Sequence, residues 1–241
     1  MSMRTCSVVV LCVSACAGAA QGAPVFFSEL GGGSILQPRN NRRIEARYRA
    51  DTTNWDTRLE FDSLPEVGDV TGAVSNSKAF FENDEFGFKL NYDHALQQVT
   101  WTITGPSPAV GVLNSLTQPT DTMGQMNTLH LFTVGTRGSV TLTDVAFMGL
   151  GMDVNAFPDL NTAPAPAVTF KETYLIFGND FNLLSGDWML TGKIAFGTFT
   201  NNNPSEGAKI TVKLRNAEIP APTALGVFAA AALFGARRRR R

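Results

Sequence analysis

The chain has 241 residues, of which 44% are hydrophobic and 17% charged, and its formal net charge is −1. Six of the 20 Lys and Arg residues, Arg4 and the run Arg237 to Arg241, lie at the two ends, which leaves 14 basic residues against 21 acidic ones. This acidic body argues against nucleic acid or an anionic lipid surface as its partner. Its length is enough for one domain with a sizeable core.

The first 22 residues have the pattern of a secretory signal peptide. Arg4 ends a short basic start, and residues 7–20 are apolar and small. Ala20 and Gly22 occupy the two small-residue positions that a signal peptidase recognises. We therefore expect signal peptidase to cut between Gly22 and Ala23.

All three cysteines of the chain lie in this first segment. They are Cys6, Cys12 and Cys16, so the mature chain should contain no cysteine. An exported domain without disulfides must be stabilised by its core. An alternative interpretation is a loose lipobox at residues 13–16, which would place a lipid on Cys16. The apolar run continues past Cys16, which favours the signal peptide.

The body, residues 23–217, has the pattern of β-structure. Apolar and polar residues alternate in short segments with Trp101 and Trp188 in phase with the apolar positions, and residues such as Gly, Pro and Asn separate the segments. The clearest segments are 44–49, 86–92, 99–103, 140–142, 188–196 and 210–215. The pair 86–92 and 99–103 predicts a hairpin or neighbouring strands. We expect one all-β domain, an antiparallel β-sandwich or jelly roll. The sequence has no internal repeat of fixed period, which argues against a propeller or a β-helix.

The body lacks the usual sequence signatures of catalysis. Its two histidines, His94 and His130, are 36 positions apart, and no spacing suggests a zinc site. There is no G-x-S-x-G elbow and no phosphate-binding loop. We expect His94 to border a turn and His130 to be the outward residue of a strand. The sequence therefore predicts a protein that is not an enzyme and has no cofactor.

Paired carboxylates are the one enzymatic pattern to weigh. Jelly-roll glycoside hydrolases place an acid and a nucleophile on one strand with the spacing E-x-D-x-x-E. Glu82 and Asp84 supply the first two positions, but the third is Gly87. We interpret Glu82, Asp84 and Glu85 as a solvated turn before the strand at Phe86.

Carbohydrate binding without catalysis is a further hypothesis. Sandwich lectins combine exposed aromatic side chains with Asp and Asn side chains, in some cases around calcium. The candidate contacts are Trp55, Asn179, Asp180 and Asn182. Against them, Asn and Asp are ordinary turn residues, and neither segment has the carboxylates of a calcium loop. We therefore expect no cofactor, with a bound calcium ion as the alternative.

The C-terminal segment, residues 218–241, has three parts. The breaker Pro220-Ala221-Pro222 comes first, and residues 223–236 carry no charge. The end is a run of five arginines: Arg237, Arg238, Arg239, Arg240 and Arg241. A helix of about fourteen residues reaches roughly 21 Å, which is short of the ~30 Å hydrocarbon core. The arginines extend this reach by snorkelling and stay on the cytoplasmic side.

This three-part order resembles the PEP-CTERM sorting signal of bacterial surface proteins. The resemblance covers about 22 residues and implies that an exosortase, a membrane cysteine protease, cuts near Pro220-Ala221-Pro222. Alanine stands where the family has glutamate, which leaves open which exosortase variant would act. The alternative is an ordinary C-terminal membrane anchor. The pattern of residues 80–216 also resembles choice-of-anchor domains, which implies a secreted β-sandwich and no particular activity.

We therefore expect a signal peptide (1–22), a β-sandwich domain (23–217) and a sorting signal (218–241). The expected function is that of an exported, exosortase-sorted cell-surface or extracellular-matrix protein with a non-enzymatic body. Its expected partners are signal peptidase, an exosortase-type protease, transiently the inner membrane, and extracellular polysaccharide as an alternative ligand. A lectin-like carbohydrate-binding module is the alternative function, and a jelly-roll glycoside hydrolase is the least favoured.

Overall fold

The computed structural model of the protein describes ten stretches of chain: 25–29, 38–50, 55–62, 70–74, 84–120, 124–135, 138–155, 157–162, 169–197 and 208–217. The predicted signal peptide with its cleavage site at Gly22 and Ala23, and the C-terminal segment from residue 218, lie outside the described residues. In the stretches that are described, no helix has the length and hydropathy needed to cross a membrane.

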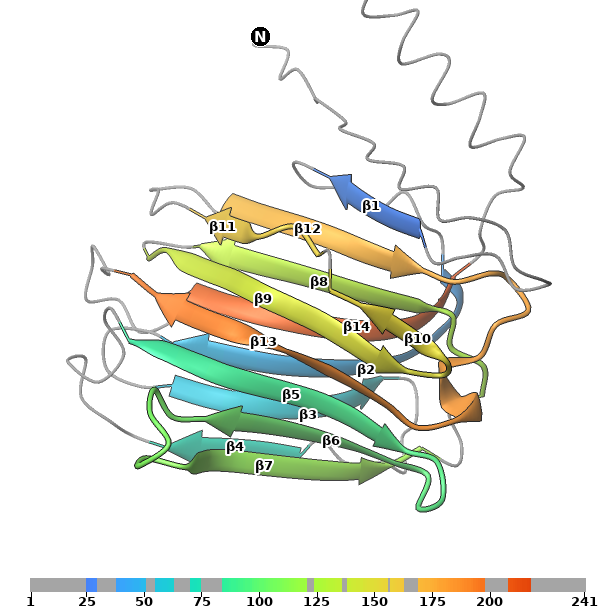
Figure 1. The fold of residues 1–241 in the computed structure, drawn as a ribbon, viewed down its shortest axis with the longest axis horizontal. Helices are drawn as coiled ribbons and strands as arrows, with labels where there is room; N and C mark the ends of the chain where they lie inside the picture. Colours follow the sequence, from blue (N-terminus) through green and yellow to red (C-terminus); the bar gives the residue numbers. More distant parts are fainter. Residues whose placement is uncertain are drawn as a thin grey trace, which may run out of the picture.

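Two antiparallel sheets face each other and form a β-sandwich (Figure 1). The first sheet, sheet A, has the strand order β1-β12-β8-β14-β2-β3-β4. Its strands, in chain order, are β1 Val25–Glu29, β2 Pro38–Ala50, β3 Trp55–Asp62, β4 Val70–Val74, β8 Thr128–Gly135, β12 Thr169–Ile176 and β14 Ala208–Ala217.

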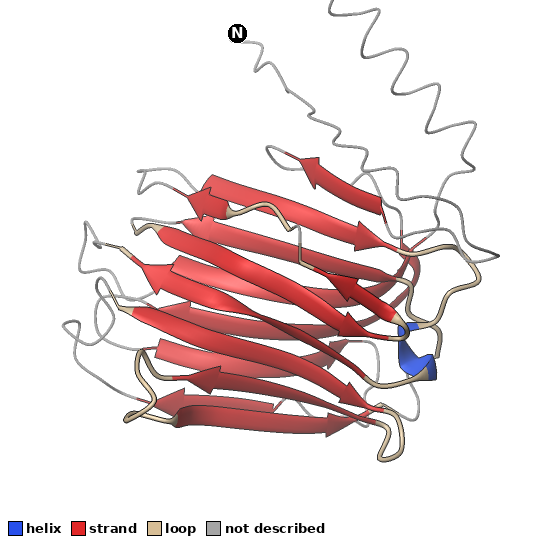
Figure 2. Ribbon diagram, in the orientation of Figure 1, coloured by secondary structure: helices blue, strands red, loops and turns tan. Residues whose placement is uncertain are grey.

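The second sheet, sheet B, has the order β10-β9-β13-β5-β6-β7, and β11 also pairs with β9. Its strands are β5 Glu85–Asp93, β6 Gln98–Thr104, β7 Val112–Pro119, β9 Val140–Gly149, β10 Met152–Val154, β11 Leu160–Thr162 and β13 Trp188–Phe196. The one helical element among the described residues is a short 3-10 helix, η1 Leu183–Ser185 (Figure 2). The all-β sandwich expected from the sequence is therefore confirmed.

The predicted alternation places the core as expected. In β2, Ile44 and Tyr48 are fully buried, and in β14 Ile210, Val212 and Leu214 are fully buried as well. The hairpin prediction is also confirmed, because β5 pairs antiparallel with β6. The apolar faces of both sheets merge into a single core because each strand sends every second side chain inward.

Large aromatic side chains connect the two sheets across this core. The Tyr48 ring of sheet A packs edge-on against Phe196 and Phe86 of sheet B, with ring centroids 5.2 and 6.0 Å apart. Trp101 of β6 is 1% exposed, and its indole Nε1 donates a hydrogen bond to the backbone oxygen of Arg47 at 3.2 Å. Because Arg47 belongs to β2, this bond fixes one sheet against the other.

Strand order along the chain does not follow from the sequence pattern. The segments ending at Phe196 and beginning at Ala208 are consecutive in the chain, yet β13 belongs to sheet B and β14 to sheet A. Each lies at the centre of its sheet, between strands distant in sequence. The chain therefore crosses from one sheet to the other between β13 and β14. Local alternation shows which side of a strand is buried but not which sheet the strand joins.

We expect Trp101→Ala to lower the free energy of unfolding by about 3–5 kcal/mol, because it removes a buried aromatic side chain and leaves a cavity. Trp101→Phe should cost less, since a ring remains. Urea unfolding of residues 23–217 measures both changes. Leu96→Ala is the control, because Leu96 is 64% exposed and its loss should change stability by less than about 0.5 kcal/mol. Equal losses of stability in Trp101→Ala and Leu96→Ala would contradict the placement of Trp101 in the core.

Candidate functional site: the charged outer face of sheet A

The outer face of sheet A is charged along three adjacent strands. β14 pairs with β2, and β2 pairs with β3, so the outward residues form rows across the strands. Ten of the eleven outward positions whose side chains the structure describes are charged and the eleventh is Thr211: Arg43, Glu45, Arg47 and Arg49 in β2; Asp56, Arg58 and Glu60 in β3; Lys209, Thr211, Lys213 and Arg215 in β14. We call these eleven positions the charged face.

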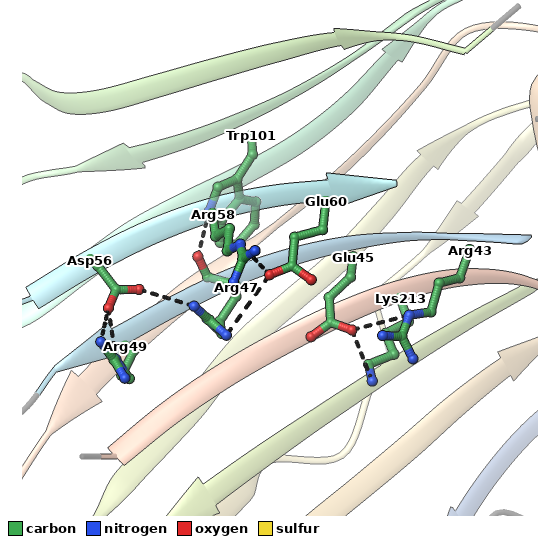
Figure 3. Close-up of polar contacts among 9 residues, drawn as sticks. All are labelled: Arg43, Glu45, Arg47, Arg49, Asp56, Arg58, Glu60, Trp101 and Lys213. Atoms are coloured by element: carbon green, nitrogen blue, oxygen red, sulfur yellow. Dashed lines mark hydrogen bonds and ion pairs between the residues drawn. The ribbon is translucent and has the colours of Figure 1, made fainter. Parts of the chain in front are cut away.

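Two carboxylates of β3 are each shared by two arginines (Figure 3). Asp56 pairs with Arg49, whose Nε lies 2.7 Å from Asp56 Oδ2, and with Arg47, whose Nη2 lies 3.6 Å from Asp56 Oδ1. Glu60 pairs with Arg58 and, at 4.0 Å, with Arg47. Arg47 thus bridges both acids, and its backbone oxygen is the acceptor for Trp101. The charged face is therefore held rigidly to the core beneath it.

The third carboxylate is shared in the same way. Glu45 Oε2 lies 3.0 Å from Lys213 Nζ and 3.4 Å from Arg43 Nε. The Lys213 ammonium also lies 4.8 Å from the centre of the Phe132 ring, in the position of a cation–π contact. Burial lowers the pKa of Lys213, with Arg43 and Arg215 adding to the effect and Glu45 opposing it. One shared carboxylate thus does not fully compensate the lysine for its loss of water.

A buried histidine lies beside this face in β8. His130 is 5% exposed, and its Nε2 donates to Glu172 Oε2 of β12 at 2.8 Å. The hydroxyl of Tyr174 donates to the same oxygen at 3.1 Å, and its ring stacks on the imidazole with centroids 4.1 Å apart. The prediction that His130 points outward from its strand is confirmed, since His130 pairs with Tyr174 and Lys213 across the strands. It is nevertheless buried, because neighbouring aromatic side chains cover it.

The surroundings of His130 favour its neutral form. Burial lowers the pKa of His130, and the hydrogen bond to Glu172 opposes this shift. The positive charges of Arg215 and Lys213 lower the pKa further. Burial also lowers the pKa of Arg215 itself. Burial is thus the main reason why the protonated form of His130 is disfavoured, with the two cations adding to this effect and Glu172 opposing it.

The candidate sugar contacts do not gather at one place. Trp55 and Asp56 begin β3, where Trp55 pairs with Ala50 and Val74 through the backbone. Asp56 belongs to the charged face. The segment 179–182 instead precedes η1, and hydrogen bonds connect it to Gln125 and Met126.

Asn182 has a structural task in the loop before η1. Its side-chain oxygen accepts from the backbone N–H groups of Leu184 at 3.0 Å and Met126 at 3.1 Å. Gln125 Nε2 donates to the backbone oxygens of Asn179 and Phe181, each at 2.8 Å. These bonds satisfy the N-terminus of η1 and the loop, as an N-cap residue does. Asp180 of the same loop is exposed.

Glu85 and His94 lie at the two ends of β5 in sheet B. Glu85 begins β5 and is exposed, and it pairs with Lys193 at 3.1 Å, while Glu82 lies outside the described residues. β5 ends at Asp93 and His94 lies in the following turn, as predicted. His94 Nδ1 lies 3.1 Å from the backbone oxygen of Leu184. The contacts of Glu85 and His94 thus stabilise the two ends of β5.

No group of three or more His, Cys, Asp or Glu side chains that could hold a metal ion occurs in the part of the chain that the structure describes. No known protein-family model matches this sequence. No curated protein matches it either.

We expect Glu45→Gln to lower the free energy of unfolding by about 1–3 kcal/mol, because it leaves Lys213 and Arg43 without their shared carboxylate in a half-buried position. The side chain of Glu45 is 10% exposed, whereas that of Glu85 is 52% exposed. The matched control Glu85→Gln should therefore leave stability nearly unchanged. Urea unfolding of both variants measures the difference. Similar losses of stability would argue against a partly buried network of ion pairs around Glu45.

The lowered pKa of His130 also predicts a pH dependence. An unfolded chain takes up this proton near the ordinary histidine pKa of about 6.5, whereas the folded protein takes it up only at lower pH. Between these two pKa values the unfolded state binds more protons, so the free energy of unfolding falls as the pH is lowered. His130→Gln should flatten this part of the curve. Urea unfolding between about pH 5 and 7.5 measures it, and parallel curves would contradict the assignment.

Proposed function

We propose that this chain is an exported protein whose sandwich is a non-enzymatic module of the cell surface or extracellular matrix. The main support for the proposal is the position of the strands in the sequence. Every strand that the structure describes falls between Val25 and Ala217. Cleavage after Gly22 and near Pro220-Ala221-Pro222 would therefore remove both hydrophobic ends without removing a described strand.

The spacing at the C-terminal end suits processing by a membrane protease. β14 ends at Ala217, and Glu218 and Ile219 separate it from Pro220. Three further residues span at most about 11 Å of extended chain, so the motif would stay close to the sandwich. A protease that acts there would release a body whose last strand is already paired on both sides, with β8 and β2.

The contacts of the charged face also support a non-enzymatic body. A catalytic carboxylate or histidine generally keeps one side open to a substrate. Here Asp56, Glu60 and Glu45 are each shared by two cations, and His130 is buried under aromatic neighbours. Such an arrangement gives a rigid, charged surface. This surface is a better basis for binding or packing than for acid–base chemistry.

Processing at the C-terminus is the test of the proposal. In the native host, the exported protein should have the intact mass of a chain that begins near Ala23 and ends at or near Pro220-Ala221-Pro222. The arginine run should hold the tail on the cytoplasmic side until the cut. Replacing Arg237 to Arg241 with serine should therefore allow the chain to pass through the membrane uncut.

Intact-mass spectrometry of protein from the envelope and the medium decides between the outcomes. A mature species that still carries Arg237 to Arg241 would make a permanent membrane anchor the better interpretation. A chain that stays in the cytoplasm with residues 1–22 attached would reject export altogether. The control is a variant with Lys89 and Lys193 replaced by glutamine, which changes charge on sheet B and should be processed normally.

A further inference from the structure

The basic residues of the body are concentrated on the charged face. Seven of the 14 that remain without Arg4 and the arginine run lie there, against three of the 20 acidic residues of the body. The rest of the body keeps seven basic and 17 acidic residues. The protein thus combines an acidic surface with one net-positive face, which is the distribution expected where an anionic ligand is to bind at one place only.

The positive charge of this face is not cancelled by its own carboxylates. Asp56, Glu60 and Glu45 are each shared by two cations, so every described carboxylate is already used twice. A guanidinium has five N–H donors, and the face carries seven cations against three acids.

The arginines are also reachable. The side chains of Arg43, Arg49 and Arg58 are 33%, 35% and 31% exposed, while the acids between them are 10–14% exposed. A ligand that approaches the face therefore meets guanidinium groups first. These groups are held in place by their ion pairs, so little side-chain entropy is lost on binding.

We propose that the charged face binds an acidic polysaccharide, laid across β14, β2 and β3. A uronic acid chain carries about one carboxylate per sugar, which accepts bidentate hydrogen bonds from arginine. Its hydroxyl oxygens accept further hydrogen bonds from the same arginines. The face thus presents mainly donors to a ligand that is rich in acceptors. Nucleic acid presents a dense row of phosphates, which the interleaved carboxylates would repel.

The proposal names a ligand class for the surface module proposed above and rests on that function, since such polymers occur outside the cell. The binding experiment uses the full chain in a non-ionic detergent, with Arg237 to Arg241 replaced by serine because the run would bind polyanions by itself. The probes are polygalacturonate, the neutral polymer dextran and single-stranded DNA. Isothermal titration calorimetry measures their affinities.

We expect polygalacturonate to bind and dextran not to bind. Arg49→Gln with Arg58→Gln should weaken binding by about tenfold or more, because both guanidiniums are partly exposed partners of the polymer carboxylates. The matched control is Lys89→Gln with Lys193→Gln, which removes two cations from the outer face of sheet B and should leave affinity within about twofold. Raising the salt from about 50 to about 300 mM should weaken binding.

Three results would overturn the proposal: no binding of polygalacturonate, equal losses in the two double variants, or tighter binding of single-stranded DNA than of polygalacturonate. Circular dichroism of each variant checks that the sandwich is intact, and the single variant Arg49→Gln, at the most exposed arginine, replaces the pair if the double variant unfolds. Because the mass measurement of C-terminal processing is made on cells, its failure is separate from a failure to bind.

Discussion

The two-residue alternation of β2 and β14 is the constraint on which the other features depend. These strands are central in sheet A, and a shift of one residue would send Arg47 into the core and Ile44 or Tyr48 to solvent. The inward positions are apolar and fully buried, so the register is strongly specified. Trp101 adds a second restraint from the opposite sheet, because its bond to the backbone of Arg47 requires both register and sheet spacing to be correct. The core and the charged face are thus two consequences of one pattern.

Electrostatics and packing are coupled on the outer side of this sheet. Glu45 and Glu60 point away from the core, yet both are buried among the arginine and lysine side chains with which they form ion pairs. Partial burial strengthens each ion pair and raises the cost of losing one partner. The same burial disfavours the charged forms of Lys213 and His130, as their lowered pKa values indicate. The charged face carries seven cations and three acids, so its net charge is positive.

A β-sandwich does not identify a function, since unrelated activities occur on similar folds. We propose a surface module because features of the sequence and of the fold agree with it. The ends of the chain have the pattern of export and sorting, and the described strands lie between them. The body lacks the catalytic spacings that a hydrolase would need. The concentration of arginine on one face adds a chemical preference, which favours the lectin-like form of a surface module.

The fold class could be predicted from the sequence because alternation is a local property: Ile44 to Arg49, Phe86 to Tyr92 and Lys209 to Arg215 each show which side is buried. The turn at His94 and the core positions of Trp101 and Trp188 could be predicted for the same reason. The charged face could not be predicted, although many of its residues are the polar positions of the alternating segments 44–49 and 209–215. Only the tertiary structure places β14 beside β2 and β2 beside β3, so that carboxylates from β3 meet arginines from β2, and Glu172 and Tyr174 of β12 enclose His130. Strand pairing joins residues far apart in sequence, and no local pattern encodes which strands will be neighbours.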